Sequence, residues 1–149
     1  MSASNDFESD ILKLIFQNIA IANIGDVAGV LPSAAAGSLF VALHTADPGE
    51  AGNQSTSEAT YTGYARVGVV RSAAGWTVSG TAPTQIANAA VITFPTSTFG
   101  APVITHFSVG YQSAGATKIL DSGALSAPQT INVGGPNTWA AGVLVVTAD

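Results

Sequence analysis

The feature that most limits what this chain can fold into is the region after residue 37, where short apolar segments alternate with turn residues. We identify about eight such segments, each of a length typical of strands. They cover residues 39–43, 64–71, 76–79, 89–94, 103–111, 116–125, 130–133 and 139–147. Gly, Pro, Asn and Ser separate them, which is typical of sandwiches and jelly rolls. We therefore expect a mainly β protein, an antiparallel β-sandwich that is jelly-roll-like and has about eight strands.

The beginning of the chain follows a different pattern, in which apolar side chains recur every three or four residues. This spacing predicts an N-terminal helix from about residue 6 to residue 22. Asn5 or Asp6 would cap its start, and Gly25 or Gly29 would end it. Its main apolar face consists of Phe7, Ile11, Leu14, Ile15, Ile19 and Ala22.

Leu12 and Phe16 widen the apolar face of this helix beyond what one core would bury. Two interpretations are open: the helix packs across the sandwich, or it docks on a neighbouring subunit. We divide the chain into a helix and linker at residues 1–36, used for attachment and assembly, and a β-sandwich domain at residues 37–149. The residues expected to contact a partner are Ile11, Leu12, Ile15, Phe16 and Ile19.

Charged side chains are scarce in this chain. They make up 9% of its 149 residues, against about 25% in an ordinary soluble domain. Because protein interfaces are depleted of charge, we expect much of the surface to face other protein. The four basic residues are scattered and the net charge is −5, so we expect no nucleic-acid partner. Polar residues interrupt the apolar stretch at 11–31, which indicates no membrane span.

No combination of residues in the sequence indicates catalysis, a cofactor or a metal site. There is no Cys, and the two histidines, His44 and His106, have only Asp47 as a nearby carboxylate in sequence. Three or four ligands are usual for a metal, and a Ser nucleophile needs a base and an orienting acid. We expect His44 and His106 to be hydrogen-bonded to backbone or hydroxyl groups. The sequence therefore predicts a protein that is not an enzyme.

Two further pairs of residues carry expectations, and the tryptophan pair admits both a structural and a functional interpretation. Trp76 and Trp139 are expected in the core or on a sheet face, with a carbohydrate platform as the alternative. Arg66 and Arg71 flank one strand, and each is expected to pair with an acidic residue of a loop.

An ordered set of short motifs resembles a family of small tailed-bacteriophage virion proteins. The set begins with LFVALHTADP at residues 39–48 and covers roughly residues 10–149. It continues with YARV (64–67), GW (75–76), NAAVITFP (88–95), VITHFSVG (103–110), GAL (123–125) and WAAGVLVV (139–146). The resemblance implies a structural protein of the virion and supplies no catalytic residues.

From this resemblance we expect a capsid cement or decoration protein, which binds the outside of the head and staples neighbouring capsomers without covalent bonds. Its partners would be the major capsid protein and copies of itself, as a dimer or trimer. It would be made in the host bacterial cytoplasm and end on the capsid exterior. The alternative is a tail, neck or fibre component that binds a host surface through Trp76, Tyr61 and the loop at 45–62.

Overall fold

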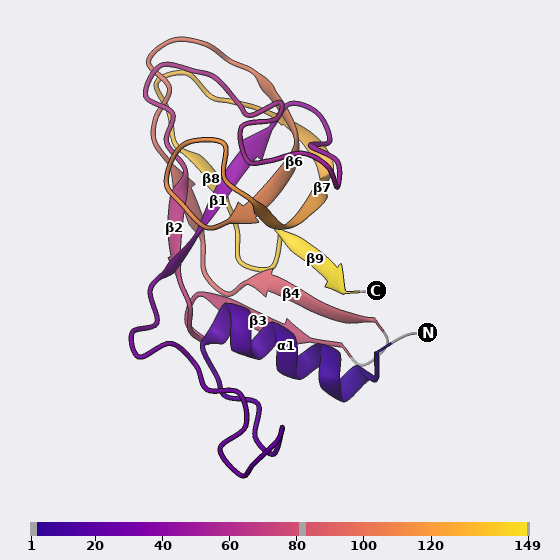
Figure 1. Cartoon of the computed structure of the whole chain (residues 1–149). Coiled ribbons are helices and arrows are strands. Elements are labelled where there is room, and N and C mark those ends of the chain that lie inside the picture. Colours follow the sequence, from indigo (N-terminus) through magenta and orange to yellow (C-terminus); the bar gives the residue numbers. More distant parts are fainter. Residues whose placement is uncertain (1–2, 81–82, 149) are drawn as a thin grey trace.

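The computed structural model describes residues 3–80 and 83–148, which form one N-terminal helix and nine strands (Figure 1). The helix is α1 (Asn5–Gln17). The strands are β1 (Ser38–His44), β2 (Val67–Val70), β3 (Trp76–Ser79), β4 (Thr84–Asn88), β5 (Ile92–Phe94), β6 (Val103–Gly110), β7 (Ile119–Thr130), β8 (Asn137–Trp139) and β9 (Val145–Ala148). All strand pairs are antiparallel. The prediction of a mainly β, antiparallel fold with an N-terminal helix is confirmed.

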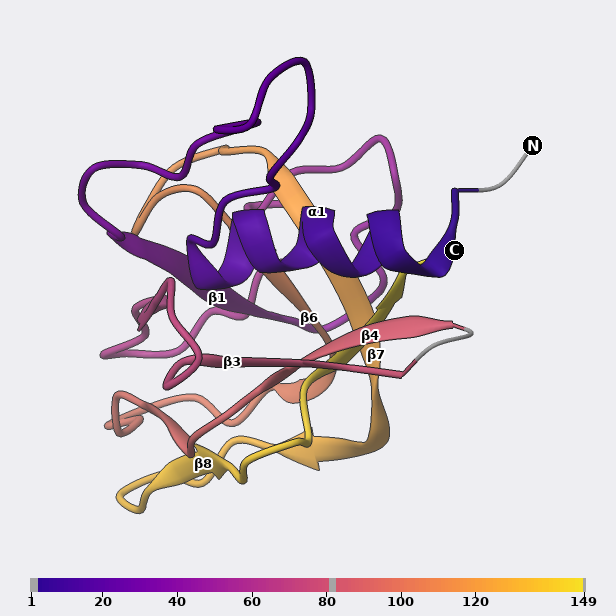
Figure 2. The same ribbon diagram turned by 90° about the horizontal axis from the view of Figure 1, so that it is seen from below.

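The strands form three sheets that surround one core. The largest has the order β2-β1-β6-β7, the second β3-β4-β9, and the third is the pair β5-β8. Figure 2 shows β1 and β6 in one layer and β3 and β4 in another. Buried side chains from all three sheets meet between these layers, including Leu43, Phe107, Ile86 and Phe94. Gly123 of β7 lets β9 come close, because a Cβ there would lie 3.0 Å from the Val145 carbonyl oxygen.

Helix α1 packs on the same core rather than standing apart from it. Leu12 and Phe16 are buried, and the rings of Phe16 and Trp76 on β3 form a T-shaped pair with a centroid distance of 5.1 Å. Both views place α1 alongside β3 and β4 (Figures 1 and 2). Of the two interpretations of this helix, the structure shows the one in which it packs across its own sandwich.

The predicted ends of α1 were wrong. Ser4 is the N-cap, and its hydroxyl accepts a hydrogen bond from the Phe7 amide. The helix ends at Gln17, because Asn18 adopts the left-handed conformation (φ 58°) and closes the last turn. Asn tolerates this conformation better than most residues, so a glycine is not needed.

Strand β4 was missed from the sequence, and the predicted strand at 130–133 is no separate strand: Thr130 ends β7, and Val133 forms an isolated bridge to Ser97. The inward side chains of β4 are Thr84, Ile86 and Asn88. Since two of the three are polar, the strand lacks the apolar alternation by which half-buried strands are identified. None of the described residues forms a helix with the length and apolar character that crossing a bilayer requires.

Candidate functional site

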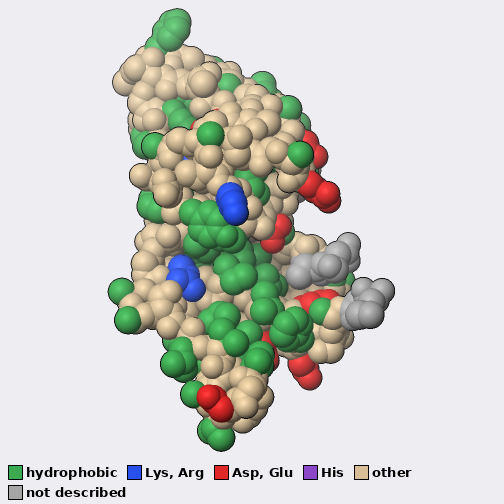
Figure 3. Space-filling model, viewed as in Figure 1, with side chains coloured by type: hydrophobic (Ala, Val, Ile, Leu, Met, Phe, Trp, Pro, Cys, Tyr) green, Lys and Arg blue, Asp and Glu red, His purple; other side chains and the backbone are tan. Residues whose placement is uncertain are grey.

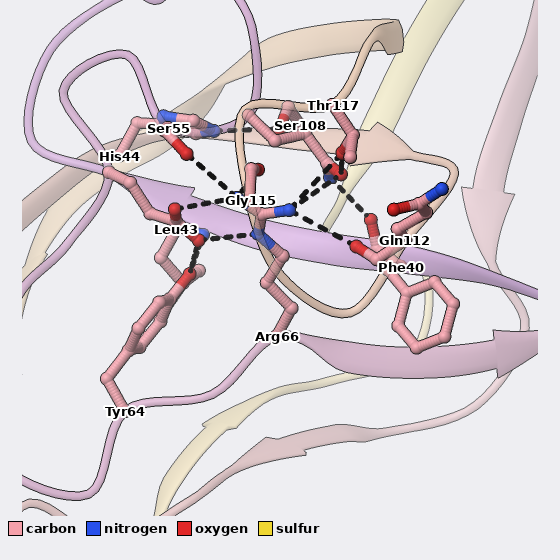
Figure 4. Close-up of polar contacts among 12 residues, drawn as sticks. Phe40, Leu43, His44, Ser55, Tyr64, Arg66, Ser108, Gln112, Gly115 and Thr117 are labelled. Carbon is pink, nitrogen blue, oxygen red and sulfur yellow. Dashed lines mark hydrogen bonds and ion pairs between the residues drawn. The ribbon is translucent and has the colours of Figure 1, made fainter.

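The densest polar cluster in the described residues surrounds Arg66, which precedes β2 (Figure 4). The Arg66 guanidinium donates seven hydrogen bonds. Two of them reach the Glu58 carboxylate, from Nε at 2.7 Å and from Nη2 at 2.8 Å. The remaining acceptors are Gln54 Oε1, Ser55 Oγ, Thr117 Oγ1 and the carbonyl oxygens of Gln112 and Gly115. The expectation that Arg66 pairs with a loop acid is confirmed.

The Arg66 cluster joins two loops that are far apart in the sequence, at residues 45–62 and 111–118. The hydrogen bonds that Arg66 donates to the Glu58 carboxylate raise the pKa of Arg66 further above its ordinary value. Tyr64 completes the cluster: its hydroxyl donates to Glu58 Oε1 at 3.0 Å and accepts from the Leu43 amide at 3.0 Å. Burial raises the pKa of Tyr64, so the phenol stays neutral. The polar groups of the cluster hydrogen-bond to one another, so its role is to hold the two loops together.

His44 forms the nearest approach to a catalytic pair in the chain. Its Nε2 lies 2.7 Å from Ser108 Oγ, and its Nδ1 lies 2.8 Å from the Thr56 carbonyl oxygen. A carbonyl only accepts, so Nδ1 carries a proton, and in the neutral ring Nε2 accepts from the Ser108 hydroxyl. Burial lowers the pKa of His44. Both His44 and Ser108 are 0% exposed, so no substrate reaches the hydroxyl.

The prediction that the histidines bind backbone or hydroxyl groups is confirmed. His106 lies opposite His44 across β1 and β6, and its Nδ1 is 2.9 Å from Thr105 Oγ1. Within the described residues, no group of three His, Asp or Glu side chains is close enough to hold a metal ion.

The aromatic side chains that could have formed a carbohydrate platform are buried. Trp76 is 1% exposed, and Trp139 and Tyr61 also belong to the core. Trp139 packs edge-to-face on Phe94, and the Tyr61 hydroxyl donates to the Pro95 carbonyl oxygen at 2.9 Å. The structural interpretation of the two tryptophans is confirmed. The platform built from Trp76 and Tyr61 is ruled out by this burial.

Arg71 differs from its prediction, because it binds the end of α1 instead of an acidic residue. Its Nη2 donates to the Leu14 carbonyl oxygen at 2.8 Å, and its Nε donates to that of Ile15. Its Nη1 reaches Ser33 Oγ and the Ala36 carbonyl oxygen in the linker. A cation at a helix C-terminus satisfies free carbonyl groups and opposes the negative end of the helix dipole. Sequence alone missed this role, since the partners are backbone atoms.

The five residues expected to contact a partner do not share one surface. Leu12 and Phe16 face the chain's own core, and Ile15 is half-buried against it. Ile11 is half-buried as well, and Ile19 is exposed. A partner that docks on this helix would therefore meet Ile19 and parts of Ile11 and Ile15, and contact through these residues stays a prediction.

An apolar groove lies beside the C-terminal end of α1. It has a volume of about 440 Å³ and is lined by Ile15, Ala35, Ala36, Gly37, Ser38, Leu39, Arg71, Tyr111 and Leu120. Figure 3 shows hydrophobic side chains gathered on this face of the molecule, next to Lys or Arg side chains. Of the residues expected to contact a partner, Ile15 alone lines this groove. The groove itself was not predicted, because its small residues lie in the segment that was interpreted as a linker. The available signal was the run of Ala and Gly at 34–37 before the first strand.

Comparison with known proteins gives one match over almost the whole chain. The family model described as Gp80: Podophage GP4 fiber I protein gp80 matches residues 2–147. No curated protein matches the chain.

Proposed function

We propose that this chain, which belongs to the family of the podophage GP4 fiber I protein gp80, is a structural subunit of a bacteriophage fibre. The observation that carries this proposal is the match over residues 2–147, which spans the helix, the linker and every strand but the end of the last. Its role would be to form non-covalent contacts with neighbouring protein chains. The low charge of the sequence supports this, because contact surfaces are poor in charged residues.

We favour an assembly role over binding of a host sugar through the aromatic residues. Sugar-binding platforms need aromatic rings that face solvent, and Trp76, Trp139 and Tyr61 are buried. The loop at 45–62 is tied down by the Arg66 cluster. By contrast, large apolar side chains are exposed in the linker after α1, including Val27 and Leu31. Exposed apolar patches of this kind mark sites of protein contact.

We assign the subunit no catalytic role. The Ser108–His44 pair is sealed inside the protein, and its Nδ1 partner is a backbone carbonyl rather than a carboxylate. The pair therefore lacks access and also lacks the acid that stabilises a charged imidazole during acyl transfer.

Decoration of the capsid exterior is the second candidate, with the major capsid protein and further copies of the chain as partners. Its support is the same charge-poor surface, which suits a capsid lattice as well as a fibre. The family description favours the fibre.

Copy number and location on the particle test the two candidates. Purified virions are separated into heads and tail complexes, and the chain is quantified in each fraction against the major capsid protein with labelled standard peptides. A fibre subunit is expected in the tail fraction at a small fraction of the capsid protein's amount. An amount similar to that of the capsid protein, in the head fraction, supports decoration. Absence from both fractions would overturn the proposal that this is a virion protein.

A further inference from the structure

The segment between α1 and β1 contains a closed loop, residues 18–33, which we call the arm. Figures 1 and 2 show it projecting from the body beyond the end of α1. Its two ends are clamped together: Asn18 Nδ2 donates to the Ser33 carbonyl oxygen at 2.9 Å, and the Ser33 amide donates to Asn18 Oδ1 at 3.0 Å. Inside the arm, Ile21 and Val30 exchange two backbone hydrogen bonds of 3.0 and 2.9 Å. Compact surface loops whose ends meet in this way are frequently functional.

The backbone of the arm is ordered and Ile21 is buried, but most of its other large apolar side chains are exposed. Val27 is 85% exposed and Leu31 is 66% exposed. Ile19, Ile24 and Val30 are exposed as well. Ordering such a loop before binding lowers the entropy cost of association. The arm therefore has the properties of a preformed contact element.

The groove beside α1 offers a surface of complementary chemistry. Its lining is mostly apolar, and its one charged lining residue is Arg71. Arg71 binds backbone carbonyls and a hydroxyl, and in the described part of the chain the only ion pair is Arg66–Glu58. The only charged residue of the arm is Asp26, whose Oδ1 accepts from the Gly29 amide and whose second oxygen has no hydrogen bond from the described residues. An apolar arm with one acid thus matches an apolar groove with one base that lacks a carboxylate partner.

The arm cannot enter the groove of its own chain. Ala34 alone separates the clamped Ser33 from Ala35, which already lines the groove. Folding the arm back over so short a hinge would break the Asn18–Ser33 clamp. An occupant with the arm's chemistry must come from another molecule.

We propose that the arm of one copy of this chain lies in the groove of a second copy, with Asp26 next to the partner's Arg71. This inference rests on the proposed function, because it describes how the structural subunit joins its neighbour. The contact joins two different surfaces of the same chain, as in a heterologous interface, and both surfaces already exist in each copy.

Disulfide trapping tests the contact directly, since the chain has no Cys of its own. Two single variants, Val27→Cys in the arm and Ser38→Cys in the groove, are purified separately, mixed and oxidised. A bond between them can form only between copies. We expect at least a tenfold higher yield of the mixed dimer than with Val27→Cys plus Thr98→Cys, a control at an exposed residue outside the groove. Equal yields in the two mixtures would overturn the proposal.

The mass of the full-length protein in solution provides the second test. The wild type is expected to be an oligomer, and Val27→Asp is expected to weaken its association at least tenfold. Val91→Asp makes the same change at a valine that is 59% exposed outside the arm, and it should leave the mass unchanged. Circular dichroism checks that each variant is folded. A wild type that stays monomeric, or a Val27→Asp variant that stays oligomeric, would refute the arm contact.

Failure of the arm contact and failure of the proposed structural role give different experimental results. A chain found in virions whose Val27→Cys variant is trapped only on a different virion protein refutes the arm contact and leaves the structural role intact. A chain that forms the arm contact in solution but is absent from virions does the reverse.

Discussion

At the scale of single residues, Arg66 holds together the part of the molecule that has least regular structure. Its guanidinium binds a carboxylate, two side-chain hydroxyls, an amide oxygen and two carbonyl oxygens from the loops at 45–62 and 111–118. Only the planar fork of arginine presents five donors in fixed directions. Glu58 supplies the balancing charge at the same place. Arg66 therefore contributes most of the side-chain hydrogen bonds between these loops, and the Gln54 amide adds a backbone link by donating to the Thr117 carbonyl oxygen at 2.9 Å.

Replacing the buried Arg66 should cost far more stability than replacing an exposed basic residue such as Lys118. Arg66→Met leaves the Glu58 carboxylate and several carbonyl groups without partners, and we expect a loss of about 3–5 kcal/mol in the free energy of unfolding. Arg66→Lys should lie between this variant and the wild type, since it keeps the charge but loses the fork. Urea denaturation measures the free energy of unfolding of the wild type, Arg66→Met and Arg66→Lys. Lys118→Met, at an exposed lysine, should change stability by no more than about 0.5 kcal/mol, and a similar loss in both Met variants would contradict this role of Arg66.

Asp121, near the start of β7, gives the stability a pH dependence of predictable sign. Burial raises the pKa of its carboxyl from 3.8 to about 6, although the Ser122 amide donates a hydrogen bond to it. The folded state therefore binds a proton more tightly than the unfolded state, and this contribution to stability is lost as the pH rises from about 4 to about 6. Asp121→Asn removes the effect. The variant should gain stability relative to the wild type across this interval and keep that gain at pH 7.

Urea denaturation at several pH values between 4 and 7 measures this difference. Asp47→Asn makes the same chemical change at an exposed carboxylate. A constant offset between Asp121→Asn and the wild type, or an equal pH-dependent difference for Asp47→Asn, would show that burial of Asp121 has no such effect.

At the scale of elements, α1 joins the core through two side chains and is fastened at its end by Arg71. Phe16 and Leu12 are buried, whereas Phe7 on an earlier turn is exposed. The helix is therefore part of the folding unit, although its face was wide enough to suggest docking on a neighbour.

Replacing Phe16 and Phe7 of α1 separately with Ala distinguishes packing of the helix on its own core from docking on a neighbour. Phe16→Ala removes the ring that packs on Trp76, and we expect a loss of about 3–5 kcal/mol in the free energy of unfolding. Phe7→Ala, at an exposed ring, should cost no more than about 0.5 kcal/mol. Thermal or urea unfolding measures the stability of both variants at protein concentrations below and above the one at which the chain associates. A Phe16 effect that vanishes when the protein is monomeric would mean that this ring packs on a neighbour instead.

The elements that the sequence predicted well are those whose buried residues are mostly apolar. Strand β3 was predicted with its observed bounds, and β1 and β6 within one residue at each end, because Val, Leu, Phe and Trp mark them clearly. Strand β4 was missed because Thr84 and Asn88 point inward and are satisfied by hydrogen bonds to residues far away in sequence, such as Asn88 to Ala140 and Leu144. Such satisfaction depends on the folded chain and leaves no local pattern.

The candidate site was predicted less well than the fold, for a related reason. The pattern of α1 placed Leu12 and Phe16 on a possible contact face, but periodicity alone does not say whether a core or a partner covers an apolar face. The roles of Arg71 and Asn18 rest on backbone partners in the linker. The groove and the arm emerge only when the linker, the end of α1 and the strands are seen together.

At the scale of the whole molecule, the chain combines a well-satisfied interior with a surface poor in charge. Its buried polar groups are bonded to one another, apart from the indole nitrogens of Trp76 and Trp139 within the described residues. Among the described residues, five large exposed apolar side chains lie in the arm, namely Ile19, Ile24, Val27, Val30 and Leu31, and others, such as Phe99, lie elsewhere on the surface. In the arrangement that we propose, the arm of each copy would be covered by the groove of a neighbouring copy.

A reconstruction of the purified virion at a resolution that separates strands tests the central claim most directly. We predict that copies of this fold lie in a fibre and touch one another, with residues 18–33 of one copy covered by its neighbour. A reconstruction in which the fold is absent, or in which its copies are separate and their arms face solvent, would contradict it.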